Sequence, residues 1–167
     1  MKKLMSLLMV LLLMAVCVMP ALAAAISVRL PVRVRVSGSV PATPEYVSIV
    51  LEAEDAACPM PEGAVDGAYT LRMRAGSESA FPPISYDQPG TYRYTIRQKR
   101  GNTPGCTYDS SLFHVEVCIA PGDDGLYPVI VVQENEGSAK LDSITFRKLG
   151  VNLTSEPKYQ TKKLYHA

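Results

Sequence analysis

The chain has 167 residues and a formal net charge of +1, with 47% hydrophobic and 20% charged residues. This balance argues against a protein that binds nucleic acid or an anionic membrane through a basic surface. The length suits one domain with a substantial hydrophobic core.

The first 23 residues are typical of a secretory signal peptide. Lys2 and Lys3 precede an uncharged run, residues 4–18, which is shorter than the ~20 apolar residues needed to span a bilayer. Small residues predict cleavage after Ala23, so we expect a secreted or cell-surface protein without a stable membrane anchor. The alternative is a lipoprotein that carries its lipid on Cys17.

The rest of the chain alternates between apolar and polar residues with a period of two, which indicates strands. Pro89-Gly90 predicts a turn, and the segment from Pro121 to Gly125 predicts a hairpin. We expect an all-β domain over residues 26–149, an immunoglobulin-like antiparallel β-sandwich of about seven or eight strands, and a disordered polar tail over 150–167. The predicted strands cover residues 32–36, 46–53, 69–74, 84–86, 91–97, 112–119, 127–133 and 143–148.

Three cysteines remain after the signal peptide, Cys58, Cys106 and Cys118, and an exported protein meets an oxidising environment. Cys58 and Cys106 lie in Pro/Gly-rich loops whose backbones can adjust, so we predict a disulfide between them. Cys118 lies within a strand, on the face opposite the apolar side chains, and is either free or an alternative partner. Spacing alone does not decide between these pairings, or exclude three free thiols.

Outward-facing arginines are the other candidate binding residues. Arg72, Arg74, Arg93 and Arg97 alternate with inward residues and form a possible face for an anionic glycan or peptide, although ordinary solvation explains them as well. The sequence has no nucleophile motif, phosphate-binding loop or zinc-ligand spacing. We therefore expect no enzymatic activity, no cofactor and no metal site.

Several motifs follow one another along the second half of the chain. They are Phe81-Pro-Pro-Ile-Ser-Tyr86, Gly90-Thr-Tyr-Arg-Tyr-Thr-Ile96, Cys106-Thr-Tyr-Asp109, Phe113-His-Val-Glu-Val117 and Asp142-Ser-Ile-Thr-Phe146. In this order and spacing they resemble the streptococcal pilin isopeptide-linkage domain family. The resemblance implies an immunoglobulin-like sandwich of Gram-positive surface and pilus proteins, with a structural or adhesive role and other surface or pilus proteins as partners.

The resemblance also implies an intramolecular isopeptide bond, in which a first-strand lysine joins a last-strand asparagine with the help of a buried acid. Here Arg33 and Arg35 stand on the first strand, and a guanidinium stays protonated and cannot attack. Gln98 occupies the position of the acid and Lys148 that of the asparagine. We therefore predict that no family-type isopeptide bond forms.

Two hypotheses for the function follow. The first is a non-catalytic structural or adhesive module of the cell surface, and the second is a freely secreted protein that binds a host or environmental glycan or protein. The chain shows no sorting signal and no apolar stretch after Lys162 and Lys163, which favours release. The tail is also compatible with a remnant of a longer anchored protein.

Overall fold

The computed structural model describes residues 24–38, 44–104, 106–135 and 137–149, and this part of the chain forms eleven strands and no helix. The predicted signal peptide, its cleavage site at Ala23, Cys17 and the tail from residue 150 lie outside the described residues. None of the described segments is a helix long and apolar enough to cross a bilayer.

One layer of the molecule is a six-stranded antiparallel sheet. The predicted hairpin is confirmed, because β8 and β9 pair as far as Gly122 and Gly125 and leave only Asp123 and Asp124 in the turn. The sheet has the order β10 (Lys140–Leu141), β9 (Gly125–Glu134), β8 (Leu112–Gly122), β7 (Gly90–Gln98), β3 (Tyr46–Ala53) and β4 (Ala68–Arg74).

The opposite layer consists of two short sheets in line with each other. Phe81 N donates to Leu30 O at 3.0 Å, across the gap between them. Pro82 and Pro83 lie within the interruption and have no N–H to continue the pairing. The three-stranded part is β11 (Ile144–Leu149), β2 (Pro31–Ser37) and β5 (Glu78–Ala80), and the two-stranded part is β1 (Ile26–Val28) and β6 (Ile84–Tyr86).

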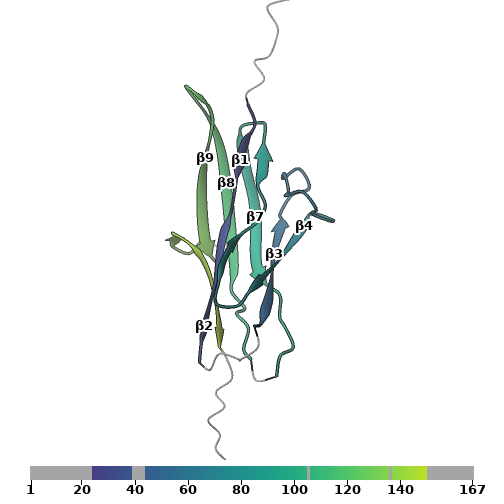
Figure 1. Ribbon diagram of the computed structural model, residues 1–167. Coiled ribbons are helices and arrows are strands. Elements are labelled where there is room, and N and C mark those ends of the chain that lie inside the picture. The colour runs from purple at the N-terminus through teal and green to yellow at the C-terminus, as the bar shows by residue number, and fades with distance from the viewer. Residues whose placement is uncertain (1–23, 39–43, 105, 136, 150–167) are drawn as a thin grey trace, which may run out of the picture.

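These two layers confirm the predicted all-β fold, with one pair that differs from a purely antiparallel arrangement. The last strand, β11, runs parallel to β2 (Figure 1). In this pairing Lys148 is the register partner of Val36. Strands β1, β5 and β10 were not predicted, because two or three residues are too few to show a periodicity.

The core lies between the layers and follows the alternation of the strands. Along β8 the buried residues are Phe113, Val115, Val117 and Ile119, every second residue of the predicted strand. The ring of Phe113 meets that of Phe146 on β11 edge to face, with centroids 4.9 Å apart. This contact joins the two layers near the end where β11 finishes.

Candidate functional site

The candidate site centres on a lysine in the interior. Lys148 is on β11, in phase with the buried residues Ile144 and Phe146, and its exposed fraction is 0%. A charged group in such a position costs several kcal/mol unless it is paired. Lys148 therefore needs a counter-charge and hydrogen-bond partners close to its ammonium group.

Glu45, which directly precedes β3, provides the counter-charge. The ammonium of Lys148 donates to Glu45 Oε2, and the side chain of Glu45 is only 15% exposed. The hydroxyl groups of Thr103 and Tyr108 each donate to Glu45 Oε1 at 3.0 Å. The carboxylate is thus held by three donors, and the ion pair links the two layers.

A thiol and an aromatic ring complete the surroundings of the lysine. Both come from the segment between β7 and β8. Lys148 Nζ lies 3.4 Å from Cys106 Sγ and 5.3 Å from the centroid of the Tyr108 ring, a distance at which a ring attracts a cation. We term Glu45, Thr103, Cys106, Tyr108 and Lys148 the Lys148 cluster.

The hydrogen bonds of the Lys148 cluster favour the charged form of both partners. Burial alone raises the pKa of Glu45, but the donors Lys148, Thr103 and Tyr108 outweigh burial and hold that pKa below its ordinary value. Burial lowers the pKa of Lys148, but its contacts with Glu45 and Cys106 raise the pKa above the ordinary lysine value. The pair is therefore ionised at neutral pH.

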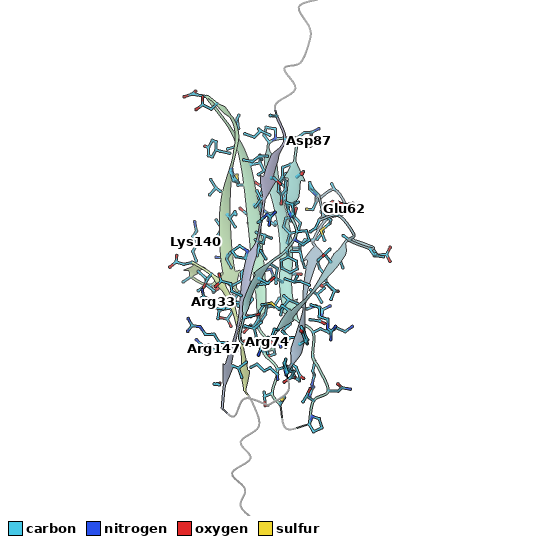
Figure 2. The ribbon with its side chains drawn as sticks, in the orientation of Figure 1. Arg33, Glu62, Arg74, Asp87, Lys140 and Arg147 are labelled. Carbon is cyan, nitrogen blue, oxygen red and sulfur yellow. The ribbon has the colours of Figure 1, made fainter. Side chains whose placement is uncertain are left out.

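The two first-strand arginines lie outside this cluster. Arg33 pairs with Glu78 on the surface at 2.6 Å, and Arg35 is exposed. Figure 2 shows Arg33 and Arg147 on the outside of the layer that contains β2 and β11. The β2 residue paired with Lys148 is Val36. Neither Arg33 nor Arg35 is therefore the register partner of the last-strand position.

Gln98 points into the interior from the end of β7, with an exposed fraction of 6%. Its Oε1 accepts a hydrogen bond from Asp109 N at 3.2 Å, while its Nε2 has no partner among the described residues. Asp109 Oδ2 in turn accepts from Arg147 N at 2.5 Å. Backbone and carboxylate contacts thereby connect β7 to β11 beside the Lys148 cluster.

The predicted Cys58–Cys106 disulfide is not formed in the structure. Cys58 follows β3, where its thiol contacts Arg93 O at 3.6 Å, whereas Cys106 contacts Glu45, which precedes β3. The length of β3 separates the two sulfur atoms, because eight residues of strand extend roughly 26 Å. Cys58, Cys106 and Cys118 are all unpaired in the described part of the chain.

The four arginines of the predicted binding face do share the outer face of the six-stranded sheet, but neighbouring residues engage three of them. Arg93 pairs with Glu116 at 3.1 Å and Arg97 with Glu52 at 2.7 Å. The guanidinium of Arg72 lies 4.6 Å above the ring of Tyr46. Arg74 is exposed. Within the described ranges, no three metal-ligating side chains are grouped to hold an ion.

Our sequence reasoning missed Glu45 altogether. The signal was present, since Glu45 is in phase with the buried residues Val47, Ile49 and Leu51 of β3. An acid on the inward face of a strand, just before a predicted core, needs a buried partner. The same alternation places Lys148 inward with Phe146.

Comparisons with known proteins agree with this architecture. Residues 41–147 match the protein family described as the Spy0128-like isopeptide containing domain. Among solved structures, the chain is similar to the major pilin protein T-13 from Streptococcus pyogenes, with 16% identity, a TM-score of 0.53, and coverage of 76% of this chain and 54% of that one. The T3.2 major pilin of the same organism gives 17% identity, a TM-score of 0.51 and the same coverage. A search of curated proteins gave no match.

These likenesses to solved pilins establish the fold. The chain spans about half the length of those pilins.

Proposed function

Because the chain belongs to the family of Spy0128-like isopeptide containing domains, we propose that it is a pilin-like structural module whose two layers are joined without the family's lysine–asparagine bond. The ion pair between Lys148 and Glu45 holds the layers together in its place. The module is non-catalytic in this proposal, and its role is mechanical support at the cell surface.

The buried position of Lys148 is the observation that carries the proposal. The last-strand position holds an amine and no carboxamide, and its neighbour on β2 is Val36, which has no nucleophile. Gln98 stands in place of the acid and cannot donate a carboxyl proton.

Intact-mass spectrometry of the exported, reduced protein tests this proposal. We expect the mass of the mature chain with every side-chain nitrogen retained. A mass lower by about 17 Da, the loss of one ammonia as an amine displaces a carboxamide nitrogen, would overturn it. The Lys148→Arg variant serves as the control, because any ammonia loss that persists in it involves another lysine.

We further propose that the protein acts at the Gram-positive cell surface after cleavage near Ala23, with other surface or pilus proteins as its partners. The alternative, a freely secreted protein that binds a glycan or host protein, receives less support. Its candidate face includes Arg93 and Arg97, and both are already paired with glutamates. Fractionation of the source cells into wall, membrane and medium distinguishes the two locations.

A further inference from the structure

The Lys148 cluster contains one group that the ion pair does not explain. Cys106 Sγ lies 3.4 Å from Lys148 Nζ and 3.9 Å from Glu45 Oε2. The carboxylate of Glu45 already balances the charge of the ammonium, so charge balance alone does not require a thiol in this place. An amine, a thiol and a carboxylate in mutual contact are, however, the groups needed for an oxidative covalent link.

The approach to the sulfur atom is open on one side. Cys106 is half-buried and lines a surface hollow, together with Gln98, Thr103 and Tyr108, whereas Lys148 is fully buried and does not line that hollow. A small oxidant can therefore reach the Cys106 thiol from solvent, while the Lys148 amine is shielded from solvent. Once oxidised, the sulfur has the Lys148 amine within contact distance.

We propose that peroxide converts this contact into a covalent sulfur–nitrogen bond between Cys106 and Lys148. In the first step the thiol attacks hydrogen peroxide, the O–O bond breaks, and the products are a sulfenic acid and one water. Sulfur is oxidised by two electrons and the peroxide is reduced. In the second step the lysine nitrogen attacks sulfur, the S–O bond breaks, and a second water leaves.

Glu45 is placed to manage the protons of the second step. Its carboxylate takes a proton from the Lys148 ammonium, which frees the amine for attack. The carboxylic acid then protonates the departing hydroxide to water. The nitrogen that has bonded to sulfur loses its extra proton to solvent, so each bond formed releases one proton overall.

The link would join the two layers, since Lys148 is on β11 and Cys106 is in the segment between β7 and β8. This inference rests on the proposed function. It gives the proposed structural module a sulfur–nitrogen bond between its two layers, at the position of the Lys148 cluster, where the family has a lysine–asparagine bond. The other cysteines have different surroundings. The Cys58 thiol contacts a backbone carbonyl, and Cys118 is on β8 opposite Thr91 and Val129.

The test uses the exported protein, first reduced, then treated with hydrogen peroxide and digested without reductant. We expect a pair of peptides joined through Cys106 and Lys148, about 2 Da lighter than the sum of the free peptides because two hydrogens are lost. Trypsin should no longer cleave after Lys148, and treatment with a thiol reductant should restore both peptides.

Matched variants separate this link from other oxidation products. Cys106→Ser should abolish the joined peptides, and Cys118→Ser should leave them unchanged. Recovery of Cys106 as a sulfinic acid beside an unmodified Lys148 would overturn the inference. So would a mass loss of about one water before oxidation that maps to Lys148 and Glu45, since the amine would already be consumed as an amide. An ammonia loss in the untreated chain would instead count against the proposed function.

Discussion

At the scale of single residues, the buried ion pair of Lys148 and Glu45 has a large effect on the stability of the fold. Removing one partner of a buried pair leaves the other charged and uncompensated in the interior. We expect Glu45→Gln and Lys148→Met each to lower the free energy of unfolding by about 3 kcal/mol. Urea denaturation at neutral pH measures the change.

The double variant Lys148→Met/Glu45→Gln provides the control for this expectation. It removes both charges and keeps an oxygen that can accept from Thr103 and Tyr108, so most of the lost stability should return. The exposed pair offers a second comparison, because Arg33→Ala should cost less than about 1 kcal/mol. A double variant as unstable as the sum of the two single variants would contradict the coupling.

The same residues predict how stability depends on pH. The folded pKa of Glu45 lies below its ordinary value of 4.5, so its contribution is complete above that pH and is lost as the pH falls toward the folded pKa. The folded pKa of Lys148 lies above 10.5, so its contribution is complete below that pH and is lost as the pH rises through the folded pKa. Between these limits the pair contributes a constant amount.

Denaturant unfolding across the pH range checks this expectation. Stability of the natural chain should fall on acidification below about pH 4.5, and the fall should be shallower in Glu45→Gln. Burial raises the pKa of Asp109, but hydrogen bonds from Arg147 and Ser111 hold that pKa below its ordinary value, so Asp109 also contributes to the acid dependence. Equal acid slopes in the two proteins would show that Glu45 does not carry the effect.

At the scale of the strands, the sequence was informative wherever alternation ran for several residues. The strands over residues 91–97 and 112–119 were predicted and are found as parts of β7 and β8, and the β8–β9 hairpin was predicted correctly. Lys148 was identified through its place in the family pattern, although its phase with Phe146 already indicated that it is buried. The same alternation on β3 would have indicated that Glu45 points inward, because it is in phase with Val47 and Ile49.

The partners of these residues could not be predicted from local pattern. Glu45 and Lys148 are 103 positions apart, and their contact depends on the parallel pairing of β11 with β2 and on the packing of the two layers. Cys106 enters through a loop, where no periodicity constrains the direction of a side chain. The disulfide prediction failed to match the structure for the same reason, because Pro/Gly-rich composition marks a loop but not the end of the sandwich at which it lies.

At the scale of the whole molecule, the two ends of the described chain lie at opposite ends of the sandwich (Figure 1). The chain enters through β1 and β2 and leaves through β11, and β2 and β11 are neighbouring parallel strands paired over six register positions. A pull on the two ends therefore draws β2 and β11 in opposite directions along their own axes. The hydrogen bonds of this ladder are loaded together and not one after another.

Single-molecule pulling tests whether this arrangement resists force. With handles at residues 24 and 149, the β2–β11 ladder is sheared, and we expect a high unfolding force. With handles at Ser37 and Leu149, which are register partners at one end of the same ladder, the pairs open one at a time and the force should be clearly lower. Both experiments break the hydrogen bonds between β2 and β11 in the same protein, so its thermodynamic stability is held constant while the direction of load on this ladder differs. Equal forces in the two geometries would show that the ladder between β2 and β11 is not the element that bears the load.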